Sequence, residues 1–176
     1  MDLHRTAFTS DRLSLRAFTA DDAQEAFAEA TPVIARFMSW DPSPTLEAFA
    51  GVWREWLPRM EAGIDLSLVL RLKSTNEFLG VTGLHRIGNP EVELGIWLKQ
   101  AAHSLGYARE SLAAIIAWAG PHIGATAFIY PVAKENRPSR RLAESLGGVV
   151  VGSRILAKAS GVRLNEVVYR IPGVAE

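Results

Sequence analysis

Residues 91–111 constrain the fold of this chain more than any other segment, because they read as a strand, a glycine loop and a helix in succession. Their sequence is EVELGIWLKQAAHSLGYARES. Alternation predicts a strand with an apolar face of Val92, Leu94, Ile96 and Leu98 and an opposite face of Glu91, Glu93, Gly95 and Trp97. Gly106 can adopt a positive φ that brings backbone amides close to a ligand, and the free N–H groups of a helix beginning at Tyr107 attract phosphate. The segment therefore predicts a site for a phosphorylated cofactor with an acidic group nearby.

The composition of the chain excludes several classes of protein and of functional site. The chain has 176 residues, of which 48% are hydrophobic, so we expect one domain spanning residues 1–176. It has no cysteine, which excludes disulfides, thiolate metal sites and a cysteine nucleophile. Its four histidines lack metal-ligand spacing, so no metal is expected. Without a membrane-length apolar run or a signal-peptide core, we expect a soluble, cytoplasmic protein that does not bind membranes.

Charge is balanced overall but not along the chain. The net charge is zero, which gives no electrostatic reason to expect nucleic-acid binding. Residues 1–98 hold 9 Lys and Arg against 14 Asp and Glu, whereas residues 99–176 hold 10 against 5. A basic second half suits an anionic cofactor and an acidic first half suits a cationic amine, unless the charges simply intermingle on the folded surface.

The rest of the chain predicts an α+β, or layered α/β, domain built on one mixed sheet. Patterns of period two predict strands at 12–18, 64–72, 78–87, 91–98, 125–132, 149–157 and 162–171. Helices are expected from Thr19 to Thr31, from Thr45 onward, from Tyr107 to a stop at Gly120 and Pro121, and over 136–146. We expect Pro58 to kink or split the second of these helices.

Several segments together resemble one family. ELGIWL, HSLGYARESL and PVAKENRPSRRLAESLGG are similar to the GNAT superfamily of N-acetyltransferases. TSDRLSLRAFTADDA and FLGVTGLHRI also resemble its RimJ/RimL-like branch, which acetylates N-terminal amines of ribosomal proteins. The resemblance implies a GNAT fold, with a mostly antiparallel mixed sheet of about seven strands and about four flanking helices. It also implies acetyl-CoA as donor, a primary amine as acceptor, and a possible homodimer.

The resemblance assigns the cofactor loop. It implies a pyrophosphate-binding turn formed by His103, Ser104, Leu105, Gly106, Tyr107 and Ala108. The family usually has glycine at Ser104, and glutamine or arginine at Ala101. Serine has less backbone freedom but adds a hydroxyl donor, so we expect CoA binding to be retained but weakened.

Two further groups of cofactor residues follow from the same resemblance. Backbone groups of Ile96, Trp97 and Leu98 would pair with the pantetheine amides and polarise the thioester carbonyl. In the N-x-x-S-x-R signature, Asn136 would bond the pantetheine arm, Ser139 would lie near the sulfur, and Arg141 would favour the phosphates. Asn136 also fits a simple helix N-cap.

Transfer to an amine needs a neutral nucleophile, because primary amines are mostly protonated at pH 7. We expect Glu93 to act as the general base, directly or through a water; the alternative is an ordinary exposed carboxylate on a sheet. Ser139 is the candidate that protonates the departing thiolate, although a serine in a first helical turn often serves only local hydrogen bonds. Without a cysteine, direct attack on the thioester is the simpler mechanism.

The acceptor side is less defined by sequence. Trp40, His85 and Glu91 are the candidate substrate-binding residues, and Trp53 is expected in the core. His85 is also open to acid–base work. A protein N-terminus and a small amine such as an amino acid, polyamine or antibiotic both remain possible acceptors. A non-catalytic acyl-CoA-binding module is the alternative from another class.

Overall fold

The computed structural model describes residues 1–89 and 91–173, and its centre is one mixed sheet of eight strands. The strand order is β1-β2-β3-β4-β5-β6-β8-β7. The strands are β1 (Ala7–Thr9), β2 (Leu13–Ala17), β3 (Leu66–Leu72), β4 (Phe78–His85), β5 (Val92–Leu98), β6 (Ala127–Ala133), β7 (Val149–Ala157) and β8 (Arg163–Pro172). The helices are α1 (Ala23–Glu29), α2 (Pro32–Ala35), α3 (Leu46–Glu61), α4 (Tyr107–Ile123) and α5 (Arg137–Ser145), with 3₁₀ turns at Ala20–Asp22 and Gln100–Ala102.

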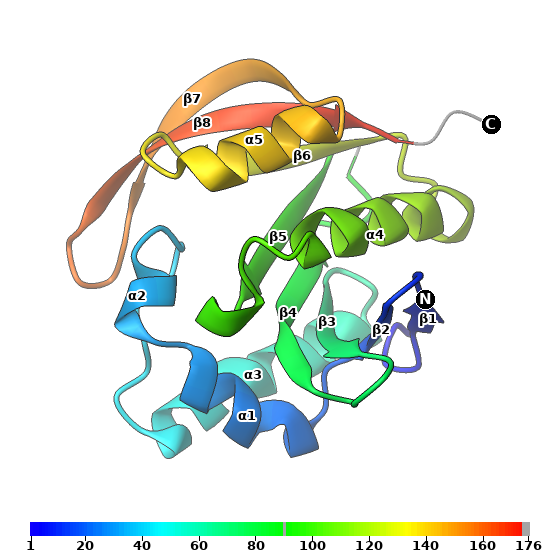
Figure 1. Ribbon diagram of the computed structural model, residues 1–176, viewed down its shortest axis with the longest axis vertical. Coiled ribbons are helices and arrows are strands. Elements are labelled where there is room, and N and C mark those ends of the chain that lie inside the picture. Colours follow the sequence, from blue (N-terminus) through cyan, green and yellow to red (C-terminus); the bar gives the residue numbers. More distant parts are fainter. Residues whose placement is uncertain (90, 174–176) are drawn as a thin grey trace.

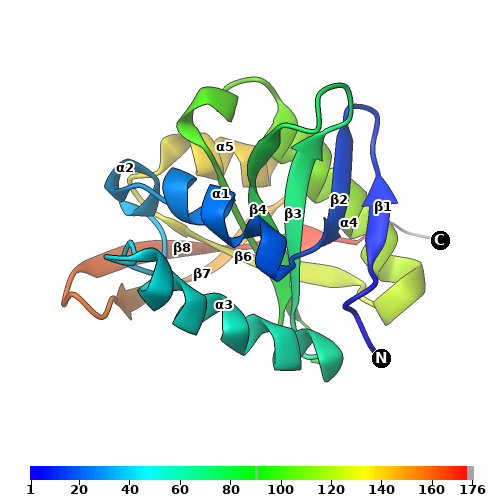
Figure 2. The same cartoon turned by 90° about the horizontal axis from the view of Figure 1, so that it is seen from below.

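Every neighbouring pair of strands is antiparallel except β5 and β6. That parallel pair is short, joining only Val92 to Phe128 and Glu93 to Ile129. Beyond these residues the two strands diverge, so the sheet is divided into β1–β5 and β6–β8 (Figure 1). Helices α1 and α3 cover one face of the first part, while α4 and α5 lie on the other face (Figures 1 and 2). The expected α+β layering and mixed, mostly antiparallel sheet are confirmed.

Local sequence signals explain where the helices begin and end. The Thr45 hydroxyl accepts a hydrogen bond from the Ala48 N–H at 3.1 Å and caps α3. Pro58 lies inside α3 without splitting it. The expected stop at Gly120 and Pro121 is wrong, because α4 continues through Pro121 to Ile123. Gly124, with a φ of 67°, supplies the left-handed cap that ends the helix.

Two short elements escape the sequence patterns. Strand β1 has only three residues, too few to show a period, and it pairs with β2 through Phe8 and Leu15. Helix α2 begins at Pro32, where a helix end was expected. Proline is favoured in the first turn, and the Thr31 hydroxyl accepts from the Ile34 N–H at 3.4 Å, so the same residues start a new helix. None of the helices among the described residues is long and apolar enough to cross a bilayer.

Candidate active site

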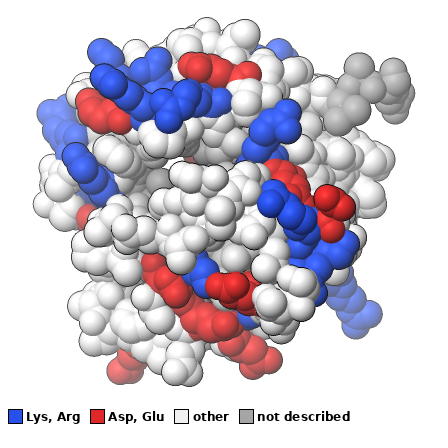
Figure 3. All heavy atoms as spheres, viewed as in Figure 1, with Lys and Arg blue, Asp and Glu red and all other residues white. Residues whose placement is uncertain are grey.

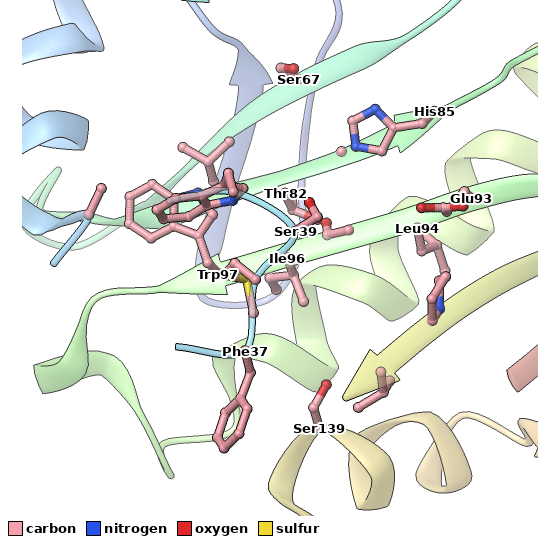
Figure 4. Close-up of a pocket in the computed structure, with 18 of the residues that line it drawn as sticks. Phe37, Ser39, Ser67, Thr82, His85, Glu93, Leu94, Ile96, Trp97 and Ser139 are labelled. Atoms are coloured by element: carbon pink, nitrogen blue, oxygen red, sulfur yellow. The ribbon is translucent and has the colours of Figure 1, made fainter. Parts of the chain in front are cut away.

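The site lies where β5 and β6 separate. Strand β5 remains paired to β4 as far as Leu98, but its other edge has lost β6 beyond Glu93. The β5 backbone from Leu94 to Leu98 therefore faces a gap without a strand partner. A cavity of about 490 Å³ lies here, lined from both parts of the sheet and from the segment after α2 (Figure 4). Of the candidate residues, it brings together Trp40, His85, Glu93, Ile96, Trp97, Asn136 and Ser139.

On the α1 and α3 side, the cavity floor is a shallow trough in the sheet. Strand register places Ser67, Gly83 and Gly95 side by side across β3, β4 and β5. The two glycines have no side chains, and the His85 ring occupies the space above them (Figure 4). A Cβ atom at either glycine would lie 3.4 Å from His85 Nε2. This nitrogen therefore lies directly over the floor of the trough.

Asp65 lies beside the other nitrogen of His85. Asp65 Oδ2 is 3.6 Å from His85 Nδ1 and 2.5 Å from Arg59 Nε, while its Oδ1 accepts from the Arg86 backbone N–H at 3.0 Å. Burial alone would raise the pKa of Asp65, but His85, Arg59 and the Arg86 N–H outweigh it and hold that pKa well below its ordinary value. The Asp65 carboxylate, stabilised in its charged form, thus lies within ion-pair distance of the imidazole.

Glu93 lies opposite His85 in the β4–β5 register and is paired with arginines. Its Oε2 is 3.5 Å from Arg154 Nη1 and 3.8 Å from Arg86 Nη2. Arg154 also donates from Nε to Glu166 at 2.6 Å, so it bridges two carboxylates of the cavity wall. Glu93 is 24% exposed and lines the cavity, as a base must.

Ser139 faces the gap from the start of α5 (Figure 4). Its hydroxyl is 2.9 Å from the hydroxyl of Tyr130, a β6 residue that the sequence analysis did not single out. Burial raises the pKa of Tyr130 to about 12, although the bond to Ser139 acts in the opposite direction. Tyr130 is therefore a protonated hydroxyl behind Ser139. The Asn136 side chain accepts from the Ser139 N–H at 3.3 Å, so it caps α5 as well as lining the cavity.

The loop before α4 has two residues with a left-handed backbone. Gly106 has a φ of 82° and Ser104 a φ of 62°, both in the left-handed region. His103 bonds through Nε2 to the Leu98 carbonyl at 2.9 Å, which ties the loop to the end of β5. Leu105 is exposed, and the backbone N–H groups of Tyr107 and Ala108 belong to the open first turn of α4.

Arg12 is a second residue that the sequence analysis missed. It donates to the Leu105 carbonyl at 3.2 Å and to Glu110 at 2.7 Å, and its guanidinium lies 4.6 Å from the centre of the Tyr107 ring. The contacts join the residue just before β2 to the loop and to α4. They span more than ninety residues of sequence, so no local pattern reveals them.

Of the remaining candidates, Trp40 forms part of the cavity wall, whereas Glu91 and Arg141 lie outside the cavity. Trp40 packs edge-on against Trp97 at 6.1 Å and lines the cavity, whereas Trp53 is buried in the core as expected. Glu91 is exposed and precedes β5, outside the cavity. Arg141 is exposed on α5 and does not line the cavity either.

Basic and acidic side chains lie partly apart on the face of the molecule shown in Figure 3. Basic side chains gather over α5 above a hollow, and acidic ones gather over α1 below it. On the right side of the same view the two signs mix. The sequence asymmetry therefore becomes a spatial one near the gap, while intermingling holds elsewhere on this face.

The family is shown by comparison with known proteins. The model of the acetyltransferase (GNAT) domain matches residues 12–149. The chain therefore belongs to the GNAT family, and it is an acetyl-CoA-dependent N-acetyltransferase, as the resemblance implied. No curated protein sequence matches the chain.

Solved structures agree on the fold. RimL, a ribosomal L7/L12 α-N-protein acetyltransferase in complex with coenzyme A, is 18% identical with a TM-score of 0.85, covering 97% of this chain and 100% of its own. A Vibrio cholerae spermidine N-acetyltransferase in complex with CoA and spermine is 16% identical with a TM-score of 0.79, over 92% and 96% of the chains. A Vibrio fischeri ribosomal-protein-S5-alanine acetyltransferase is 14% identical with a TM-score of 0.79, over 96% and 97%. The fold thus agrees with the expected RimJ/RimL-like branch, but the three differ in acceptor.

Proposed function

We propose that this enzyme transfers an acetyl group from acetyl-CoA directly to a primary amine. The amine belongs either to a protein N-terminus or to a small molecule. The observation that carries the proposal is the cavity between the separated strands β5 and β6, which has Glu93 and Ser139 in its lining. A base and a proton donor facing one space are what direct transfer requires.

The residues around the gap fit acetyl-CoA. The β5 backbone beyond Glu93 has no strand partner there, so it can bond an extended arm that carries amides. The left-handed backbone at Ser104 and Gly106 turns the loop amides toward the start of α4, where a diphosphate is favoured. Bound in this way, acetyl-CoA supplies an acetyl group activated as a thioester.

The side chains then carry out the proton transfers. Glu93 accepts a proton from the ammonium of the acceptor, directly or through a water, which frees the nitrogen lone pair. The nitrogen forms a bond to the acetyl carbon as the carbon–sulfur bond breaks. The Ser139 hydroxyl donates a proton to the departing sulfur and regains one from the nitrogen, which loses its second proton as the amide forms. The Tyr130 hydroxyl, 2.9 Å away, stays protonated and orients Ser139. Glu93 then releases its proton to solvent. The products are an N-acetylated amine and CoA.

Substitution of Glu93 tests the base. Glu93→Gln keeps the shape of the side chain but cannot accept a proton, so kcat should fall by roughly 100-fold or more while the Kd for CoA changes little. Glu91→Gln is a matched control, because Glu91 lies two residues before Glu93 in the sequence but outside the cavity. Near-normal turnover of Glu93→Gln would remove Glu93 as the base.

The family match supports a transferase. The alternative that Ser104 and Ala101 left open in the sequence, a non-catalytic acyl-CoA-binding module, makes the opposite prediction. Mass spectrometry of acetylated peptides and small amines separates the two, because the module would bind CoA and acetylate none of them. Thermal unfolding with acetyl-CoA tests the cofactor separately, since a ligand that binds the native state raises the melting temperature. No shift at millimolar acetyl-CoA would contradict both proposals. The homodimer stays a prediction, which light scattering can test.

A further inference from the structure

The carboxylates around the cavity already have partners. Glu93 faces two arginines, and Glu166 receives the 2.6 Å bond from Arg154. Asp41 accepts from both the backbone N–H and the hydroxyl of Ser160 at 2.9 Å. These three are the acidic side chains of the cavity lining within the described residues. Apart from Glu93, which meets the reacting amine, each of them is already bonded within the cavity wall, so a second ammonium group of an acceptor would have to compete with these bonds.

The wall on the α1 and α3 side is instead apolar and largely aromatic. It contains Phe27, Phe37, Met38, Trp40, Phe49, Val52, Trp56 and Trp97. Rings meet at angles rather than lying flat together, with Trp40 against Trp97 and Phe49 against Trp56, both 6.1 Å apart. Such edge-to-face groups leave ring faces and edges available to an apolar or aromatic substituent.

This wall is held in place by an arch, which we define as residues 35–41 together with the β7–β8 turn at 158–160. The Lys158 side chain is 4% exposed, and its Nζ donates to the Ala35 carbonyl at 2.7 Å and to the Trp40 carbonyl at 3.4 Å. The Asp41 bonds to Ser160 add a second tie. A buried lysine that bonds backbone carbonyls fixes the segment bearing Phe37 and Trp40, so the apolar wall is preformed.

We propose that the acceptor is a monoamine whose amino group is attached next to a large apolar or aromatic group, and that polyamines are poor acceptors. The proposal rests on the proposed acetyl transfer and names the acceptor class for the same site. Two kinds of molecule have such an amine: a peptide whose first residue is apolar, and a small arylalkyl amine. In both, the amine lies near Glu93 while its substituent packs on the wall.

An acceptor panel with acetyl-CoA and the purified enzyme tests the proposal. We expect kcat/KM for 2-phenylethylamine and for peptides beginning with Phe, Leu or Met to exceed that for spermidine, ethylamine and peptides beginning with Gly or Asp by about tenfold or more. Higher values for the apolar peptides than for 2-phenylethylamine would identify a protein N-terminus as the source, and the reverse would identify a small amine. Spermidine or a Gly peptide equal to the apolar acceptors would overturn the proposal.

Variants of the wall and the arch provide the second test. In Trp40→Ala, the ratio of kcat/KM for 2-phenylethylamine to that for ethylamine should fall about tenfold, and Lys158→Met should lower it in the same direction. Ser160→Ala serves if Lys158→Met does not fold. Val33→Ala is the control, because Val33 is exposed on α2 and outside the cavity. An unchanged ratio in both Trp40→Ala and the arch variant would contradict the proposal.

The panel separates two kinds of failure. If the enzyme binds CoA but acetylates no amine, the proposed function fails and the acceptor class fails with it. If it acetylates amines but prefers spermidine or ethylamine, the proposed function holds and only the acceptor class is wrong.

Discussion

Ser104 adopts a backbone conformation that a side chain disfavours. Its φ of 62° lies in the left-handed region, where a Cβ atom costs roughly 1–2 kcal/mol relative to glycine. The family resemblance implied glycine at this position, and the structure supplies the physical reason. The serine keeps the loop shape at the cost of local strain.

We therefore predict that Ser104→Gly stabilises the protein. Relief of the strain is partly offset by the greater freedom of glycine in the unfolded chain, which leaves a gain of roughly 0.5–1 kcal/mol in the free energy of unfolding. Urea denaturation measures it. Ser104→Ala keeps the Cβ and should show no gain, so equal stabilisation by both variants would contradict the role of strain.

Residues of the candidate site differ in how far sequence could predict them. Glu93 and Ser139 lie in segments with family motifs, which is why the sequence singles them out, and both line the cavity. Asp65 lies at the end of a turn before β3 and acts only through His85, twenty residues later. Tyr130 is hidden among the apolar residues of β6, and Arg154 lies on β7, sixty-one residues from Glu93. Their roles arise from pairing across the sheet, which no local spacing records.

At the level of elements, a buried ion-pair network attaches α1 to the sheet. Asp22 is fully buried just before α1 and accepts from Arg16 of β2 at 2.6 Å and from Arg71 of β3 at 3.1 Å. Arg71 also pairs with Glu25 of α1. Burial would raise the pKa of Asp22, but the bonds from Arg16, Thr19 and Arg71 outweigh it and lower that pKa.

This network should make stability depend on pH in a defined direction. Because the pKa of Asp22 is lower in the folded state, its charge stabilises the fold above its unfolded pKa of about 4, and this contribution is lost as pH falls toward the folded value. Asp22→Asn should therefore cost about 3 kcal/mol at pH 7 and progressively less below about pH 4. Chemical denaturation at pH 7 and pH 3 measures both. Asp21→Asn, an exposed neighbour, is the control, and a pH-independent cost would contradict the prediction.

Elements with long periodic patterns were predicted within a few residues, as β7 and α5 show. The helix boundaries that were predicted wrongly fail because capping residues decide them. Proline was taken as a terminator at both Pro32 and Pro121, yet a threonine cap begins a helix at the first and a later glycine ends a helix beyond the second. Both outcomes depend on neighbouring residues rather than on proline itself.

At the scale of the whole molecule, the β5–β6 separation leaves strand edges open in the middle of a sheet. The amides of β5 that face the gap are not protected by strand pairing. If the cofactor arm pairs with this edge, it completes the ladder there.

Hydrogen exchange followed by mass spectrometry should reveal this pairing. Addition of CoA should slow exchange in peptides that cover residues 94–98 and 103–108, because new hydrogen bonds protect those amides. Strand β3, already paired on both edges, serves as the internal reference. Protection that appears in the loop but not along β5 would show that the phosphates bind without the predicted strand pairing.

Lys158 anchors the segment that bears Phe37 and Trp40, so the length of the β7–β8 hairpin helps to set the shape of the cavity wall. The lysine reaches Ala35 only because β7 and β8 extend this far before they turn. Two residues added to each strand would carry the turn about 7 Å further and move its anchor past the helix it now meets. We expect an insertion in this hairpin to shift the segment that bears Phe37 and Trp40, and so to reshape the apolar wall, while Glu93 and Ser139 stay in place. Insertions at this turn are accordingly the place to begin when redesigning the acceptor range.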